Sequence, residues 1–312
     1  MILLNSSRAF RLAGLLAAAF VVPVFAGSHN LGAEETGRSP DLEAAWEAKY
    51  ENSTTPEWAR EKTDKWPGIK EILFEDREVL EGKDVIALET PYRAFDAAIV
   101  PISITAAAAQ SKDRYIKAIT VVADENPSPI AATFNLGPQN GIASISTRIR
   151  IDRYTNVRAI AEMNDGKLYM VSNFVKATGG CSAPALDSME AAMAKLGKMK
   201  LKILSPSSES NPGTAQILIS HPNYSGLQFD QIRRTEIPAH FVDSIKIEKD
   251  GEMLLSIKSD ISISEDPSIH FHYVGANEGE MKATVTDSEG SVFEKSWPLS
   301  KSISAAPAPG EG

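Results

Sequence analysis

Short stretches of alternating apolar and polar residues, separated by turn sequences, run through most of this chain and restrict it to an antiparallel β fold. In the clearest stretch, Ala143 to Ile151, every second residue is apolar except Thr147, as on one face of a strand. The pairs Asp165-Gly166 and Asp250-Gly251 each separate two such stretches and are typical of hairpin turns. The pattern therefore predicts an all-β protein built from antiparallel sandwiches.

A change of composition divides this pattern into two blocks. Residues 186–197 are rich in Ala and Met, lack β-branched residues and end in glycine, which favours a short helix. We therefore expect two sandwiches in tandem, residues 66–181 and residues 199–302, joined by a helical connector at 182–198. The Ala- and Pro-rich residues 303–312 are predicted to form a disordered tail.

The N-terminal stretch has the pattern of a secretory signal peptide. Arg8 and Arg11 precede an apolar run that ends in small residues, so we expect residues 1–26 to be cleaved and the mature protein to be periplasmic. An uncleaved membrane anchor is the alternative. Residues 27–65 are polar and acidic, with an amphipathic stretch from Asp41 to Tyr50, and are interpreted as an N-terminal helical arm.

The chain is acidic, with a formal net charge of -9 that becomes -11 once the signal peptide is removed. A surface of this sign argues against partners such as nucleic acids and anionic membranes. The sequence also lacks the nucleophile elbow, zinc-protease, phosphate-loop and dithiol motifs. We therefore expect a protein that is not an enzyme and binds no cofactor or metal of its own.

One cysteine, Cys181, is the candidate functional residue, and it follows Gly179-Gly180. Exported proteins use cysteines in disulfide pairs, so a single one suggests a free reactive thiol or an intermolecular bond. The glycines suggest a flexible arm that could offer the thiol to another protein. Lys176, five residues earlier, could lower the pKa of the thiol. A small apolar filler in the core is the structural alternative.

Histidine and arginine pairs on expected strands have two interpretations each. His270 and His272 lie two residues apart and would face the same side of a strand, as metal ligands or as a solvated surface. Arg148 and Arg150 could form a basic stripe for an acidic partner or an anionic cargo, or a simple solvated face.

Several segments resemble the two subunits of the bacterial sulfur-oxidation carrier, SoxY and SoxZ. In the first block the matching segments are residues 124–129, 132–134, 147–151, 161–166 and 175–181, the last ending in Gly179-Gly180-Cys181. In the second block they are residues 219–222, 237–241 and 290–293, which include His221 and His240. The order of the two matches makes the chain similar to the fused SoxYZ-like carriers associated with quinoprotein dehydrogenases.

The resemblance implies two immunoglobulin-like sandwiches packed on each other. It also implies that Cys181 is the covalent attachment residue and that Gly179 and Gly180 are its arm. The implied partners are periplasmic redox enzymes: a quinoprotein dehydrogenase that carries pyrroloquinoline quinone, its cytochrome, or Sox-type enzymes. His221 and His240 are interpreted as structural or interface residues.

The chain departs from the family where the motif ends. Ser182-Ala183-Pro184 and the second block follow Cys181, whereas the family motif closes a subunit with a free terminus. Cys181 would therefore lie on a loop tethered at both ends. Three hypotheses stay open: a carrier linked to a quinoprotein dehydrogenase, a carrier of thiosulfate-derived sulfur, and a non-covalent adaptor for a dehydrogenase or cytochrome.

Overall fold

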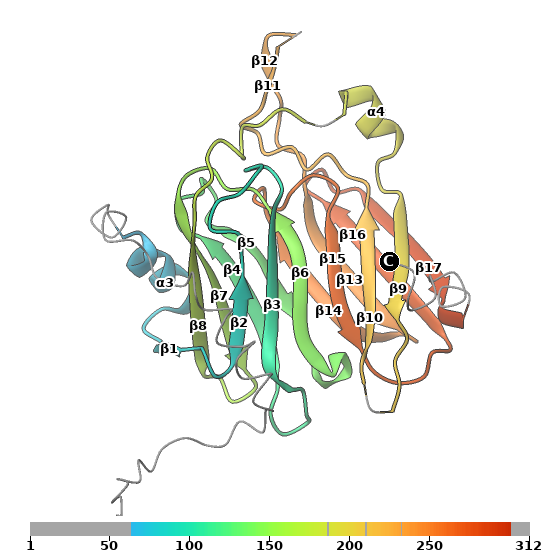
Figure 1. The fold of residues 1–312 in the computed structure, drawn as a ribbon. Coiled ribbons are helices and arrows are strands. Elements are labelled where there is room, and N and C mark those ends of the chain that lie inside the picture. Colours follow the sequence, from blue (N-terminus) through green and yellow to red (C-terminus); the bar gives the residue numbers. More distant parts are fainter. Residues whose placement is uncertain (1–63, 186, 210, 232, 301–312) are drawn as a thin grey trace, which may run out of the picture. The chain divides into compact units, whose positions relative to one another are not determined.

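The computed structural model describes residues 64–185, 187–209, 211–231 and 233–300, all within the unit Ser39–Gly312 (Figure 1). Outside the described residues lie the expected signal peptide at 1–26, the N-terminal arm up to residue 63 and the tail at 303–312. Among the described residues, no helix is both long and apolar enough to cross a membrane.

Two sheets face each other (Figure 1). The larger has nine strands in the order β1-β8-β7-β4-β5-β14-β13-β16-β17. Its strands are β1 Val79–Glu81, β4 Ile116–Ala123, β5 Ile130–Asn135, β7 Thr155–Met163, β8 Leu168–Val175, β13 Val242–Lys249, β14 Glu252–Ser259, β16 Glu280–Asp287 and β17 Val292–Pro298. The smaller, β2-β3-β6-β15-β10-β9, comprises β2 Ile86–Glu89, β3 Val100–Ala109, β6 Ile142–Ile149, β9 Met199–Ser205, β10 Gly213–Ile219 and β15 Ser268–Tyr273.

The short elements lie outside these two sheets. They are the helices α3 Trp66–Phe74 and α4 Met189–Ala194, the 3-10 turn η1 Pro138–Asn140, and the hairpin strands β11 Phe229–Asp230 and β12 Thr235–Glu236. The hairpin and α4 lie at the same end of the sandwich, the upper end in Figure 1.

The prediction of an all-β fold with two sandwich domains is confirmed. We call the described residues up to Cys181 the first half and those that follow the second half, and each sheet runs across both halves. In the larger sheet β5 of the first half pairs with β14 of the second from Ala132↔Ser259 to Asn135↔Ser256. In the smaller sheet β6 and β15 meet at the single pair Ser146↔His270. Because unpaired strand edges expose main-chain donors and acceptors, this edge-to-edge joining covers one edge of each half.

Alternation explains why these strands form a sandwich with a shared core. Along β6 every second residue is buried, with Ala143, Ile145 and Ile149 facing the opposite sheet. One continuous apolar cluster includes residues from both halves, such as Phe134 and Phe271, both fully buried. Burial of one large aliphatic or aromatic side chain contributes about 1.5–3 kcal/mol.

Both predicted Asp-Gly turns are confirmed as hairpins, between β7 and β8 and between β13 and β14. Gly166 has φ 88° and Gly251 has φ 82°, a left-handed conformation that glycine adopts without steric cost. The predicted connector helix is also present, but it is shorter than residues 186–197. It begins at Met189, where the Ser188 side chain accepts a hydrogen bond from the Ala191 N–H at 3.2 Å.

The interpretation that strands begin at Trp66 was wrong, because Trp66–Phe74 is a helix with proline in its first turn. Ile69 and Phe74 of this helix pack on the outer face of the larger sheet in a second apolar cluster. The outer face of β4 and β7 is correspondingly apolar, which explains why β4 is buried along nearly its whole length. The Arg158 guanidinium lies 4.7 Å from the Trp66 ring centroid and pairs with Asp124 at 2.7 Å.

Candidate functional site

Cys181 follows β8, where the chain leaves the first half and passes over the second. Its side chain is fully buried, at 0% exposure, and its thiol is free. This differs from the expectation of a thiol at the tip of a flexible, accessible segment. The site is therefore the arm around Cys181, residues 179–183, together with the two walls that enclose it.

The first-half wall holds the arm by backbone contacts. The Gly180 N–H donates to the Ile151 carbonyl at 2.9 Å, and the Gly179 N–H donates to the Asp152 carbonyl at 2.8 Å. A Cβ at Gly180 would overlap the main chain of Ala97 and lie 2.7 Å from the Ile151 oxygen. Glycine is thus required for close approach of backbones rather than for mobility. Gly179 has φ 78°, which also favours glycine.

The second-half wall holds the arm by side chains from the loop that follows β10. The Ser225 hydroxyl donates to the Cys181 carbonyl, and the Gln228 amide donates to the Ala183 carbonyl at 2.9 Å. Gln228 also fixes Ser225, because its side-chain oxygen accepts the Ser225 N–H at 3.2 Å. Tethering at both ends, as the sequence indicated, is therefore reinforced by hydrogen bonds to the second half.

The closed arm makes the thiol unreactive. Burial, followed by the charge of Asp152, raises the pKa of Cys181 to about 12, while the nearby Arg150 lowers it. A thiol rather than a thiolate is a weak nucleophile. The neighbouring cation is thus Arg150 and not Lys176, whose ammonium lies 4.6 Å from the centroid of the Tyr92 ring.

The expected basic stripe is not formed, because Arg150 is buried beneath the arm. Its guanidinium donates to the Ile263 carbonyl at 2.6 Å in the second half. The Asn126 side chain holds this segment in place, donating to the Arg150 carbonyl at 2.7 Å and accepting the Asp152 N–H at 2.8 Å. Arg148 instead lines the outer face of the smaller sheet and donates to the Asp266 carbonyl at 2.8 Å.

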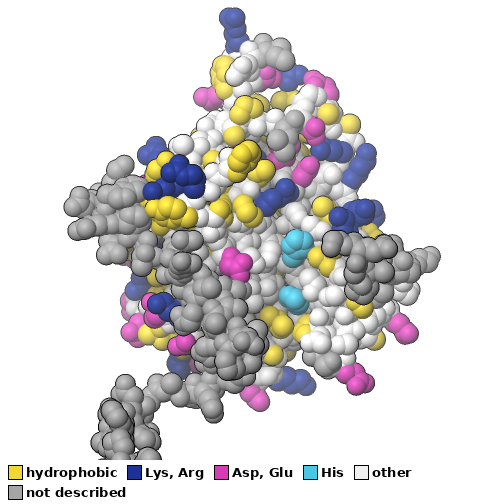
Figure 2. All heavy atoms as spheres, in the orientation of Figure 1, with side chains coloured by type: hydrophobic (Ala, Val, Ile, Leu, Met, Phe, Trp, Pro, Cys, Tyr) yellow, Lys and Arg dark blue, Asp and Glu magenta, His cyan; other side chains and the backbone are white. Residues whose placement is uncertain are grey.

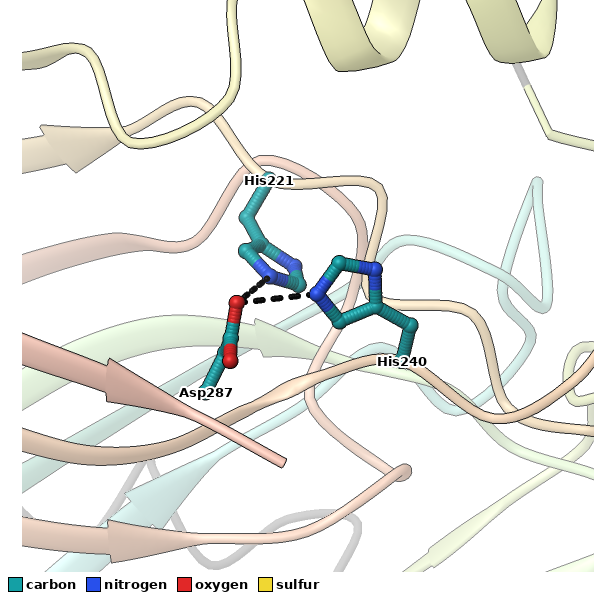
Figure 3. Close-up of side chains that lie close together, drawn as sticks. All are labelled: His221, His240 and Asp287. Carbon is teal, nitrogen blue, oxygen red and sulfur yellow. Dashed lines mark hydrogen bonds and ion pairs between the residues drawn. The ribbon is translucent and has the colours of Figure 1, made fainter. Parts of the chain in front are cut away.

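A second polar cluster, formed by two loop histidines and the last residue of β16, lies next to the second-half wall (Figure 3). His221, His240 and Asp287 are all buried, and the two histidine Nε2 atoms lie 3.6 and 2.8 Å from Asp287 Oδ2. The two imidazole rings are edge to face, with centroids 4.7 Å apart. Sequence reasoning treated His221 and His240 as structural or interface residues but missed Asp287, which lies 47 residues from His240 in sequence.

The cluster has metal-binding residue types, but its hydrogen bonds do not suit a metal. The Asn223 N–H donates to His221 Nδ1 at 3.0 Å, so that nitrogen holds the lone pair and Nε2 carries the proton. A metal at Nε2 would leave the ring with no proton at all. Burial, followed by the proximity of His240, lowers the pKa of His221 to about 4. The neutral imidazole therefore serves to order the loop that leads to Ser225.

The other histidine pair lies on β15, with His270 and His272 both partly buried. The described residues show no third ligand near them. His270 instead lines a groove of about 700 Å³ on the outer face of the smaller sheet, together with Arg148 and Gln216. Figure 2 shows histidine side chains on this face.

Comparisons with known proteins identify both halves. Residues 70–181 match the family model of the sulfur oxidation protein SoxY, and residues 202–298 match that of the sulphur oxidation protein SoxZ. The chain belongs to the SoxYZ family. Both domains are present in one polypeptide, and the SoxY match ends at Cys181.

Solved structures give weaker likenesses. The sulfur carrier protein SoxY from Chlorobium limicola f thiosulfatophilum is 23% identical, with TM-score 0.31, over 36% of this chain and 91% of that one. A superoxide reductase (neelaredoxin) from Ignicoccus hospitalis is 12% identical, with TM-score 0.29, over 33% and 96%. No curated protein matches significantly. The family assignment rests on the two family models.

The residues that enclose the thiol were largely beyond sequence reasoning. Ser225, Gln228 and Ala97 lie in loops far from Cys181 in sequence, and no local pattern marks them. Asn126 and Arg150 did fall within segments that resemble SoxY, but their roles depend on tertiary contacts.

Proposed function

We propose that this SoxYZ protein is a carrier whose cargo is bonded covalently to the sulfur of Cys181. One observation supports this most directly: the single thiol ends the SoxY domain and is enclosed by both domains. The charged groups that act on the pKa of this thiol are Asp152 and Arg150, and the Asp152 carboxylate raises that pKa, which opposes formation of the thiolate. We therefore propose that the reactions on the cargo are performed by partner enzymes.

The arm must open before such a partner can react with the thiol. Opening breaks the hydrogen bonds of Gly179, Gly180, Ser225 and Gln228. Each contributes about 0.5–1.5 kcal/mol net, so the total of a few kcal/mol is within reach of the free energy of docking a partner. Released into water, the thiol would regain an ordinary pKa of about 8.5 and its nucleophilicity.

We further propose a periplasmic location, reached through the signal peptide at 1–26, and a link to a quinoprotein dehydrogenase system. Pyrroloquinoline quinone would be bound by the partner and not by this chain. The support is the signal-like sequence and the resemblance to fused carriers of that type. Thiosulfate-derived sulfur, handled by Sox-type enzymes, is the alternative cargo.

The distance that the arm can extend into a partner's active site limits which partners, and therefore which cargoes, are possible. The arm continues through Pro184 into α4 instead of ending at a free terminus. A doubly tethered loop extends less far than a free tail, which favours a partner with a shallow active site. Replacing residues 185–188 with a long Gly/Ser linker should increase partner turnover if reach limits it, and unchanged turnover would refute this limit.

A non-covalent adaptor is the second candidate function, and the burial of Cys181 favours it, since an inert thiol need not react. Replacing Cys181 with serine in the host separates the two. A carrier loses the pathway activity that depends on this protein, whereas an adaptor keeps that activity and still binds its partner. Full activity of Cys181→Ser would contradict the carrier.

A further inference from the structure

Large exposed hydrophobic side chains gather around the arm. Of the eleven such side chains among the described residues, five belong to segments that contact it. We call these five the collar: Tyr92, Phe95, Tyr154, Leu227 and Phe229. Phe95 is fully exposed, at 108% relative to its extended reference. Single exposed hydrophobics are ordinary, but a group of them marks an interaction surface.

Contacts of their segments place the collar residues beside the arm. The Lys176 N–H donates to the Tyr92 carbonyl at 2.8 Å, and Ala97, two residues after Phe95, packs on Gly180. Tyr154 follows the Asp152 segment that accepts the Gly179 N–H. Leu227 and Phe229 flank Gln228, which holds Ala183.

The charges in the first-half part of the collar are mixed, with one positive charge in excess. The cations Arg93, Arg153 and Lys176 stand against the carboxylates of Asp96 and Asp152, whereas the whole chain carries -9. In the second half one cation, Arg233, pairs with two carboxylates, Glu190 at 3.1 Å and Asp230 at 3.5 Å, so this pairing leaves no positive charge in excess. Figure 2 shows hydrophobic and basic side chains next to one another toward this end.

We propose that the collar is the docking surface for the enzyme that reacts with Cys181. This rests on the carrier function. The partner's active-site entrance would present an apolar pocket for Phe95, with carboxylates facing Arg93 and Arg153. The loop that displays Phe95 also forms the wall against Gly180, so docking on this loop would displace the wall and release the arm.

The test uses the full chain in its host, with the fraction of Cys181 that carries an adduct measured by intact mass spectrometry. The double variant Phe95→Ser/Tyr154→Ser should lower this fraction at least about tenfold, since buried aromatic anchors dominate interfaces. The control Ile72→Ser/Val292→Ser removes two exposed hydrophobic side chains outside the collar and should load normally. Equal unfolding temperatures would show that all variants fold.

Normal loading of the collar variant would overturn the docking surface and leave the carrier function standing. Absence of any adduct on the wild-type protein during active metabolism would overturn the carrier function and the collar with it. A second variant, Arg153→Glu, reverses one exposed charge and should also lower the fraction of Cys181 that carries an adduct. A fraction equal to that of the wild type would contradict the acidic character of the partner.

Discussion

The two walls of the Cys181 arm differ in how they are built. The first-half wall is main chain against main chain, and at Gly180 it has no room even for a methyl group. The second-half wall consists of hydrogen bonds from two side chains, Ser225 and Gln228. The comparison teaches that the arm is positioned by one domain and secured by the other. A change in the first wall should therefore expel the arm, whereas a change in the second should only loosen it.

Gly180→Ala should have the largest effect on the arm, because it disrupts the first-half wall. The added Cβ overlaps the main chain of Ala97, so the closed state is lost and Cys181 becomes exposed. The four hydrogen bonds that hold the arm amount to about 4 kcal/mol, and their loss corresponds to a rise in the iodoacetamide alkylation rate on the order of a thousandfold. Gly68→Ala, where nothing lies within 4 Å, is the control and should alkylate like the wild type. An unchanged rate in Gly180→Ala would refute the closed arm.

The pH dependence of alkylation distinguishes the closed arm of the wild type from the open arm of Gly180→Ala. With the pKa of closed Cys181 raised to about 12, the population of open thiolate in the wild type keeps growing as pH rises past 9. The rate should therefore increase through pH 10 without a plateau. In Gly180→Ala the thiol titrates in water, and the rate should level off near pH 9. A wild-type plateau near pH 9 would show that the thiol is already exposed.

Ser225→Ala and Gln228→Ala test the second wall. Each removes a hydrogen bond of about 1 kcal/mol, so alkylation should accelerate about fivefold in either variant. Gln228→Ala should have the larger effect, because Gln228 also orients Ser225. Ser111→Ala, in an exposed loop of the first half, serves as the matched control. A hundredfold effect from either wall variant would overturn the difference between the walls.

The last prediction concerns folding stability and the histidine cluster that supports the second wall, where little effect on the alkylation rate is expected. The pKa of His221 is lowered from 6.5 to about 4 in the folded state. Between these two values the unfolded state binds a proton at His221 and the folded state does not. Stability should therefore fall by about 2 kcal/mol between pH 7 and pH 5 on this account alone. His221→Gln should flatten this slope in denaturant unfolding. An equal slope in the variant would show that His221 does not contribute to it.

Much of the sandwich was predictable from the sequence because it depends on local signals. Alternation placed β6, and Asp165-Gly166 and Asp250-Gly251 placed two hairpins. The helix at Trp66–Phe74 was missed because its apolar residues pack on a sheet face that is itself apolar, a relation between distant segments. The pairing of β5 with β14 likewise depends on two edges that no local pattern marks.

Cys181 could be selected from the sequence because it is the single thiol and follows two glycines. The burial of Cys181 could not be predicted, because the glycines are compatible with either a mobile arm or a tight approach to Ala97 and Ile151. Only the fold distinguishes these cases. The triad of His221, His240 and Asp287 could not be predicted either, since it joins two histidines that precede β11 and β13 to the last residue of β16, all separated in sequence.

Intact mass spectrometry of the protein isolated from its own host, with and without reductant, tests the central claim most directly. The carrier account predicts a mass increment that maps to the Cys181 peptide and is lost in Cys181→Ser, and the size of the increment would identify the cargo. A reductant-sensitive increment would indicate a sulfur-linked cargo. An unmodified Cys181 throughout active metabolism would contradict the account and favour the adaptor.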